Sequence, residues 1–419
     1  MTELTNLKEQ VCKSIDDNKD KLLSISHEIH SNPELAFEEF KAAKLLSEES
    51  ERVGMKVSRE AYGLETAFAS DFGNEDGPRV AILSEYDALP GIGHSCGHNI
   101  IATTGFGAAA ALLEIKDSLP GSIRYLGTPA EERGGGKEFM AQEGAFEEVS
   151  AAMMVHPAGV DLSTMPSICV SEVQVTYTGR SAHASAIPHM GINALDALVT
   201  AYQSIAQLRQ HIKQTERIHG IFEETGFAPN IVPEVASGKF FVRAADAQDL
   251  APLKKRVQGC FDAGATATGC KVDVSWAAVD YLDIKTNWPL AEAYEQNATH
   301  LGREFLALDQ MPSSSAGSTD MGNVSHRVPS IHPLIACAPQ NVVIHNPEFA
   351  KWAASELGDK SCIDGAKSLA MTTLDFLFDE ELQEKASQSF KETEKNSKKV
   401  VDLSFNPSGD TSIGGCGCC

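Results

Sequence analysis

Four short segments of the sequence bring metal-ligand side chains close to acidic ones. They are SEYDALPGIGHSCGHN (84–99), GTPAEERGGGKE (127–138), MMVHP (153–157) and VVIHNPEF (342–349). Thiolate, imidazole and carboxylate groups are the donors that zinc and related divalent ions take from proteins. Cys96 and His98 flank a single glycine, so both can turn toward one point. Of the adjacent Glu131 and Glu132, one can bind metal while the other shuttles a proton, which indicates a metal site with an acid–base group beside it.

Each of these features, taken alone, also has an ordinary explanation. A lone histidine such as His156 or His345 is usually hydrogen-bonded in the core or at the surface. A glutamate pair usually lies on a solvated face, and Cys96 with His98 would also suit a cysteine-nucleophile hydrolase. The occurrence of all four segments in one chain favours the metal site. A thiol nucleophile would survive a chelator, whereas a metal-activated water would not.

The elements that must position these side chains follow from the apolar pattern. Short apolar runs at 80–83, 123–126 and 151–155 alternate with helical stretches such as 100–115. This alternation predicts an α/β fold, a doubly wound sheet with helices on both faces. In such sheets, sites form at the carboxyl ends of the strands, where three of the four segments lie.

A second domain is predicted from residue 167 onward, where the pattern becomes βαββαβ. This order predicts an inserted ferredoxin-like α+β lid at 167–284. The catalytic domain would then comprise 1–166 and 285–382. Residues 383–419 are polar and rich in Lys, Glu and Ser, then in Gly and Cys, so we expect a flexible tail there.

Composition excludes several classes of protein. The 419 residues carry 35 Lys and Arg against 58 Asp and Glu, a net charge of −23 that disfavours a nucleic-acid partner. Hydrophobic residues make up 42%, which excludes a disordered or fibrous chain. The sequence contains no apolar run of the ~20 residues that a membrane span needs and no visible secretory signal. We therefore expect a cytoplasmic protein with reduced cysteines.

Several of these motifs carry a resemblance to a known family. The sequence resembles the M20 family of metallopeptidases and amidohydrolases, and within it the aminoacylase-like subgroup that includes dipeptidases. The matching motifs follow the family's order over most of residues 20–378. They are HEIHSNPELAFEE (27–39), SEYDALPGIGHSCGHN (84–99), GTPAEE (127–132), YTGRSAHAS (177–185), GSTDMGNVSH (317–326) and HNPEF (345–349).

The resemblance implies a catalytic domain that holds two divalent metal ions, with zinc expected and manganese or cobalt as the alternatives. Cys96 would bridge the ions, Glu131 would be the general base, and Asp87 would orient a ligand imidazole. The remaining side-chain ligands would be His98, Glu132, His156 and His345.

The resemblance also implies roles for the lid. His183 would reach the active site of a partner subunit, in a homodimer formed through the lid domain. Asn230 and Arg243 would grip the polar end of the substrate, and Gly317 and Ser318 would line the substrate cleft. We interpret the histidines that match no ligand position as structural: His94, His189, His326 and His332.

The function that these residues favour is metal-dependent hydrolysis of amide bonds in dipeptides or N-acyl amino acids. One alternative is a biosynthetic enzyme that forms amides at the same site. Another is a non-catalytic binding protein that retains the fold, although the complete residue set argues against it. The chain ends GGCGCC, similar to the lipidated ends of small GTPases, so membrane contact is expected only if Cys416, Cys418 or Cys419 is lipidated.

Overall fold

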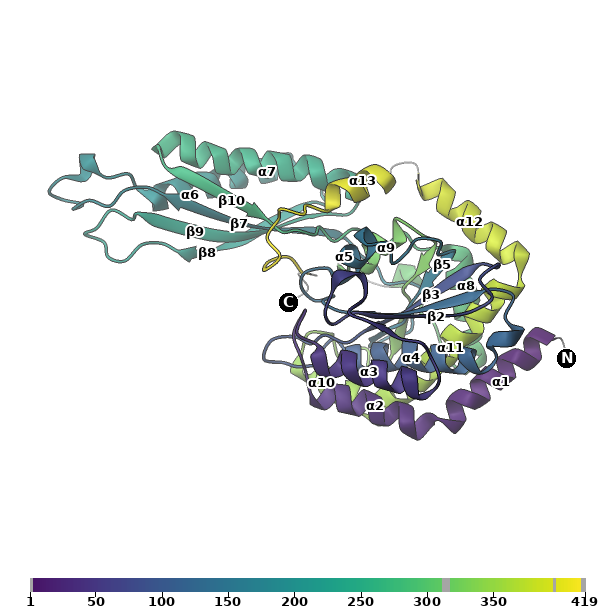
Figure 1. Cartoon of the computed structure of the whole chain (residues 1–419). Coiled ribbons are helices and arrows are strands. Elements are labelled where there is room, and N and C mark those ends of the chain that lie inside the picture. Colours follow the sequence, from purple (N-terminus) through teal and green to yellow (C-terminus); the bar gives the residue numbers. More distant parts are fainter. Residues whose placement is uncertain (1–2, 311–316, 395–396, 416–419) are drawn as a thin grey trace. The chain divides into compact units, whose positions relative to one another are not determined.

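The computed structural model describes residues 3–310, 317–394 and 397–415, and divides the chain into two compact units (Figure 1). The first contains Met1–Pro166 and Ile284–Lys398, and the second contains Ser167–Asp283 and, of the described C-terminal residues, 399–415. Both divisions lie within one residue of the predicted domain boundaries. None of the helices in these ranges has the length and apolar content of a membrane span.

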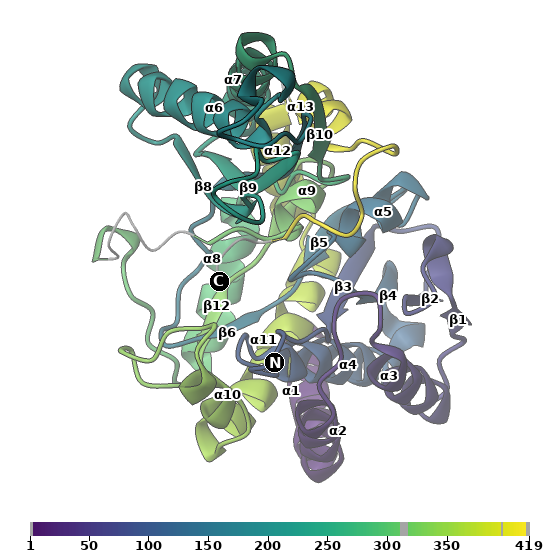
Figure 2. The ribbon, with the colours of Figure 1, turned by 90° about the vertical axis from the view of Figure 1, so that its left-hand side faces the viewer.

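The first unit is built on a six-stranded sheet with the order β1-β2-β4-β3-β5-β11 (Figure 2). Strands β4, β3, β5 and β11 are mutually parallel, whereas β1 and β2 form an antiparallel edge. The runs predicted at 80–83, 123–126 and 151–155 are β3, β4 and β5. The strands are β1 (Ser58–Arg59), β2 (Phe68–Gly73), β3 (Arg79–Glu85), β4 (Ser122–Thr128), β5 (Ala151–Met153) and β11 (Ser330–Ile331), with a separate parallel pair β6 (His156–Ala158) and β12 (Leu334–Ala336).

Helices cover both faces of this sheet. Successive side chains of a strand point to opposite faces, so one strand contributes to the core on each side. Val80 and Ile82 of β3 join the core beneath α4 and α11, whereas Ala81 and Leu83 join the core beneath α5 and α9 (Figure 1). The predicted doubly wound α/β class is therefore confirmed. The helices are α1 (Glu3–Asp17), α2 (Lys19–Ser31), α3 (Phe40–Arg52), α4 (His98–Glu114), α5 (Gly136–Gln142), α8 (Trp288–His300), α9 (Met321–Ser325), α10 (Pro347–Ala353), α11 (Glu356–Phe378) and α12 (Glu380–Glu394).

Helix α4 packs directly against β3. A Cβ atom at Gly105 would lie 2.7 Å from the backbone oxygen of Leu83, so only glycine permits this approach. Nearly every residue of α4 is buried. The end of β3 and the beginning of α4 are thus fixed relative to each other.

The second unit has the predicted βαββαβ order. Its four strands form an antiparallel sheet with the order β10-β7-β9-β8, and α6 and α7 pack on one face. This is the inserted ferredoxin-like lid. The elements are β7 (Cys169–Thr178), α6 (Ala194–Leu208), β8 (Arg217–Glu224), β9 (Val235–Ala244), α7 (Ala247–Thr268) and β10 (Lys271–Trp276).

The expectation of a flexible tail at 383–419 is wrong for the described part of that segment. Helix α12 extends to Glu394, and the backbone oxygen of its buried Ala386 accepts a hydrogen bond from Asn287 Nδ2 at 2.8 Å. Helix α13 (Ser397–Ser404) buries Val400 and Val401 in the core of the second unit. The few apolar residues that pack against the rest of the chain were not evident in a segment of mostly polar composition. Cys416, Cys418 and Cys419 lie outside the described residues.

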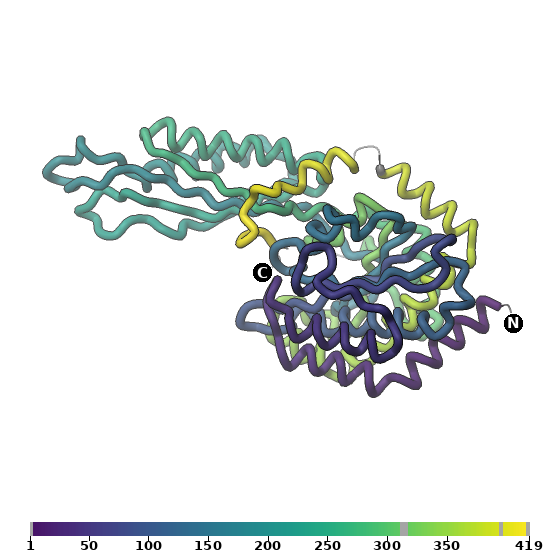
Figure 3. The backbone as a smooth tube through the Cα atoms, viewed as in Figure 1, coloured from purple at the N-terminus to yellow at the C-terminus, as the bar shows by residue number. Residues whose placement is uncertain are grey.

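Beyond α13 the chain adds backbone hydrogen bonds to the second unit (Figure 3). Asp280 donates from its backbone nitrogen to Ser404 O at 2.7 Å, and Asn406 donates in the same way to Ala278 O at 2.8 Å. Asp410 N donates to Trp276 O at 3.0 Å. These bonds run along the strand-like segment that follows β10, so the C-terminal segment is an integral part of this unit.

We predict that replacing both buried valines of α13, Val400→Ala with Val401→Ala, lowers the free energy of unfolding by about 2–4 kcal/mol, because apolar contacts are lost and cavities form. The matched control is Leu403→Ala on the exposed side of the same helix, which should change stability by less than about 0.5 kcal/mol. Urea unfolding followed by circular dichroism measures both changes. Equal stability of the double variant and the wild type would mean that α13 does not pack as described.

Candidate metal centre

The backbone of the first unit brings the predicted site segments together at one edge of the sheet. β3 ends at Glu85, β4 ends just before Glu131 and Glu132, and His156 follows β5. Parallel strands present their carboxyl ends at the same edge, so these side chains converge. His345 reaches the same place from the loop before α10.

Gly97 allows Cys96 and His98 to face one point. Its φ of 82° is left-handed, and a Cβ atom there would lie 2.5 Å from Pro157 Cγ. Any other residue would strain the turn and push away the segment that carries His156. The glycine between the two candidate ligands is therefore a geometric requirement.

Five predicted ligands form two groups that share Cys96. Its Sγ lies 3.3 Å from His156 Nε2 and 3.3 Å from His345 Nε2. His98 completes the first group with Cys96 and His156, and Glu132 completes the second with Cys96 and His345. Within each group the ligand atoms lie within 4.8 Å of one another. The thiol between the two groups has the position that a bridging ligand requires.

These groups fit divalent metal ions. Nitrogen and sulfur ligands about 2.0–2.3 Å from one tetrahedral ion stand about 3.5 Å apart, close to the separations of Cys96 from His156 and from His345. His345 Nε2 also lies 3.3 Å from Glu132 Oε2. Nε2 of His98 is buried without a hydrogen-bond partner among the described residues. Buried polar atoms normally have such a partner, so this nitrogen fits the role of a metal ligand.

Asp87 orients two of the candidate ligands. Its Oδ1 accepts from Nδ1 of His98 at 2.9 Å, and its Oδ2 accepts from the backbone nitrogen of Glu132 at 2.8 Å. The first bond leaves Nε2 of His98 directed at the ligand group. Nδ1 of His156 likewise donates to Pro157 O at 2.7 Å, which directs its Nε2 toward Cys96.

The two buried imidazoles titrate in opposite directions. Burial alone would lower the pKa of His98, but the charge and hydrogen bond of Asp87 outweigh it and raise this pKa to about 9. Burial and the neighbouring His98 lower the pKa of His156 to about 3. His156 is therefore neutral and ready to bind, whereas metal binding to His98 must displace a proton.

Glu131 lies beside the ligand groups. Its Oε2 is 3.7 Å from His98 Nε2, and its side chain is almost fully buried. Burial, with the charges of Glu85 and Glu132, raises the pKa of Glu131 well above its usual range. A carboxyl group with such a pKa has the basicity to exchange protons with a reacting water.

Sequence reasoning missed Lys137, which lies fully buried at the same edge. Its Nζ is 2.5 Å from Glu85 Oε1 and 2.7 Å from Asp320 Oδ1. Burial alone would lower the pKa of Lys137, but Asp320 and Glu85 outweigh burial and raise it, so the side chain is an ammonium ion. A lysine within a glycine-rich stretch is usually solvated, so no local pattern indicates this burial.

His332, interpreted as structural, also lies against the centre. It is fully buried, and its ring centroid is 5.4 Å from that of His156. Only the folded β11–β12 region brings it there.

Three of the predicted substrate residues belong to the second unit. His183 is exposed, and its Nδ1 accepts from the backbone nitrogens of Ser185 and Ala186 at 3.3 Å. Asn230 is exposed on the adjoining loop, where its backbone oxygen accepts from Ala184 N at 3.0 Å.

Arg243 is largely buried in the same unit. Its Nε donates to His219 Nε2 at 3.2 Å, and its guanidinium lies 5.5 Å from the Phe241 ring centroid.

Gly317 and Ser318 precede Asp320 in the first unit. Gly317 N donates to Pro166 O at 3.0 Å. Ser318 is buried.

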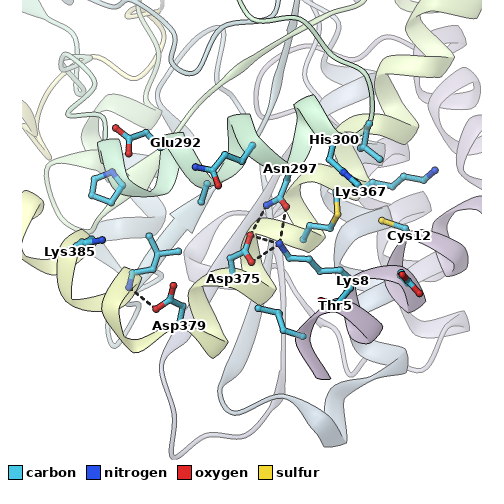
Figure 4. A pocket seen from close by; sticks show the side chains of 18 of the residues that line it. Thr5, Lys8, Cys12, Glu292, Asn297, His300, Lys367, Asp375, Asp379 and Lys385 are labelled. Carbon is cyan, nitrogen blue, oxygen red and sulfur yellow. Dashed lines mark hydrogen bonds and ion pairs between the residues drawn. The ribbon is translucent and has the colours of Figure 1, made fainter. Parts of the chain in front are cut away.

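A separate groove of about 850 Å³ lies among α1, α8, α11 and α12 (Figure 4). Its Lys8 contacts Asn297 and Asp375, and its Lys367 pairs with Asp16. None of the predicted site residues is among its lining residues. Lys8 and Lys367 of this groove are thus both paired with acids.

Comparison with known proteins agrees with this geometry. The family model for peptidase family M20/M25/M40 matches residues 81–374. The chain is 40% identical over 402 residues to a mouse Xaa-Arg dipeptidase and 38% identical over 410 residues to the human one, with 93% of each chain covered in both cases. A solved Bacillus subtilis structure, described as a dinuclear metal-binding peptidase of the M20 family, matches the fold with a TM-score of 0.66. That alignment has 20% identity and covers 86% of this chain and 99% of the other.

Proposed function

The chain belongs to peptidase family M20/M25/M40 and is a metal-dependent hydrolase of amide bonds, and from this premise we propose that it is a dinuclear dipeptidase for dipeptides that end in a basic residue. The observation that carries the proposal is the position of Cys96 between two ligand groups, with Glu131 beside them. The proposed location is the cytoplasm, a compartment that keeps thiols such as that of Cys96 reduced.

In this proposal one ion is held by Cys96, His98 and His156, and the other by Cys96, Glu132 and His345. Thiolate and imidazole donors suit zinc best, with manganese or cobalt as the alternatives. When bound, a pair of such ions polarises the scissile carbonyl and lowers the pKa of a water molecule.

Glu131 acts as the general base. Its carboxylate takes a proton from the attacking water as the new C–O bond forms, and then gives that proton to the leaving amine as the C–N bond breaks. Its burial supports this role, because the raised pKa brings its basicity closer to that of the reacting groups. Asp87 keeps His98 in the ligating orientation throughout.

The lid residues bind the substrate. The guanidinium of Arg243 suits the terminal carboxylate, which its planar fork binds through two hydrogen bonds. His219 and Phe241 hold that side chain in place before substrate arrives. Asn230 adds a polar contact, and Gly317 and Ser318 support the cleft from the catalytic domain.

The preference for a basic residue is supported by the two dipeptidases with which this chain shares most of its length. The net charge of −23 also attracts a cationic substrate over distance. The same site could act on N-acyl amino acids, and direct assay separates these substrates.

We predict that kcat/KM for Ala-Arg exceeds that for Ala-Glu and for N-acetylarginine by about tenfold or more, which corresponds to about 1.4 kcal/mol. Hydrolysis by the zinc-, manganese- and cobalt-loaded enzyme, followed by release of the free amino acid, measures these ratios. A higher kcat/KM for N-acetylarginine would assign the enzyme to acyl amino acids instead.

Glu131→Gln should lower kcat on the preferred dipeptide by about 10²–10⁴-fold, because the amide cannot accept the water's proton. Metal content, measured by elemental analysis, should stay close to that of the wild type. Glu143→Gln, an exposed acid beyond α5, is the matched control and should retain full activity. Wild-type kcat in metal-loaded Glu131→Gln would refute the general-base role.

We further propose a homodimer formed through the lid, with His183 reaching the partner's active site. Strand β8 lies at the edge of the lid sheet, so its outer backbone groups are available for pairing with a second copy. The same edge exposes apolar side chains, with Ile221 65% and the nearby Phe227 96% exposed. Exposed apolar side chains of this kind are typical of a protein–protein interface.

Ile221→Asp is therefore expected to convert the dimer to monomer, because a charge would be buried without a partner in the interface. Activity should fall with the dimer, since His183 acts across it. Sedimentation velocity measures the oligomeric state, and Val199→Asp on the exposed side of α6 serves as the control. A wild-type monomer, or an Ile221→Asp dimer, would exclude this interface.

A further inference from the structure

Lys137 is the only lysine that the described part of the chain buries completely beside the ligand groups. It lies in the first turn of α5, and its ammonium contacts one carboxylate from the end of β3 and one from the segment before α9. The backbone nitrogen of Lys137 also donates to Asp320 Oδ2 at 2.9 Å. Burying an ammonium ion costs several kcal/mol, which the two buried carboxylates must offset.

The contacts of Lys137 reach into the metal centre itself. Glu85, its first partner, places Oε2 3.8 Å from His98 Nε2. Glu85, His98 and Glu131 form a third group of possible metal ligands whose atoms lie within 4.8 Å of one another. This group is richer in carboxylate than the two that share Cys96, so it would favour hard cations such as Mn²⁺.

The ammonium makes two short charge-assisted contacts inside the protein. They are 2.5 Å to Glu85 and 2.7 Å to Asp320, so the ammonium occupies the space between these two carboxylates. We propose that Lys137 is a built-in third cation of the centre: its ammonium fills the place of a metal ion between Glu85 and Asp320 and so keeps Glu131 from being captured as a ligand. This inference rests on the proposed two-ion site.

The charge of the centre supports this role. In the two-ion site proposed above, six buried groups would be anionic: the thiolate of Cys96 and the carboxylates of Glu85, Asp87, Glu131, Glu132 and Asp320. Two divalent ions supply four positive charges and Lys137 supplies a fifth. One negative charge then remains in the centre, and a general base such as Glu131 must carry a negative charge to accept a proton. Without Lys137, two buried carboxylates would lack a counter-charge and would have to bind a cation or a proton.

The test is the metal content of Lys137→Met, which keeps an unbranched side chain, one heavy atom shorter, and removes its charge. The full chain is stripped with a chelator, dialysed against Zn²⁺ and then Mn²⁺, and analysed by inductively coupled plasma mass spectrometry. The wild type is expected to hold about two ions per chain. Lys137→Met is expected to hold one more, as Mn²⁺ with an electron paramagnetic resonance signal typical of oxygen ligands.

Two control variants accompany this measurement. Lys254→Met removes an ammonium that contacts Asp280 at 2.6 and 2.8 Å in the second unit, and should bind the wild-type number of ions. Lys137→Arg retains the positive charge and should also bind the wild-type number. An additional ion in Lys254→Met would show that any unpaired buried acid recruits Mn²⁺, and would overturn the specific role of Lys137.

The outcomes separate this inference from the proposed function. A wild type that holds no ions would refute the two-ion site itself. If the wild type and Lys137→Met both hold two ions, the two-ion site stands and the inference fails, because protons have replaced the ammonium. Lys137→Gln serves as a second uncharged variant. If both uncharged variants fail to fold in metal-free medium, excess Mn²⁺ should restore their folding together with the additional ion. A failure of that rescue overturns the inference.

Discussion

Burying like charges together is unfavourable unless positive charge is buried with them. The catalytic domain buries many acidic groups at one site, so it must also bury positive charge there. Five carboxylates and one thiol are buried around the metal centre, and four of these six groups belong to overlapping clusters of possible metal ligands. In water-poor surroundings their mutual repulsion would be severe. Cations must therefore balance the charge of the centre. The ammonium group of Lys137 is one such cation, and it is part of the chain itself. Burial, together with this repulsion, raises the pKa of Glu131.

The fold holds these groups through close backbone contacts. Gly105 lets α4 rest on β3, and Gly97 lets Cys96 and His98 share one turn beside Pro157. The parallel strands then deliver Glu132 and His156 to the same edge. Because helix and strand are in direct contact, the distances between ligands are set by rigid elements, and this rigidity is what a metal site requires to select an ion.

The sequence predicted the features that local patterns encode. The apolar runs at 80–83, 123–126 and 151–155 located strands β3, β4 and β5. The acids and the histidine that follow these runs indicated the site edge, and the βαββαβ order identified the lid. It could not predict the burial of Lys137, because its partner Asp320 lies nearly two hundred residues away and only the fold brings them together. The packed α13 was missed for a related reason. Val400 and Val401 are two apolar residues in a polar segment. They become buried only against a lid surface that is built from residues distant in sequence.

We propose that Cys96 joins two ligand groups into one dinuclear centre. The most direct measurement is a crystal structure of the zinc-loaded protein with anomalous diffraction data at the zinc edge. Two peaks about 3.5–4 Å apart are expected, both bonded to Cys96 Sγ, with His98 and His156 on one and Glu132 and His345 on the other. A single peak, or zinc bound away from Cys96, would contradict the account.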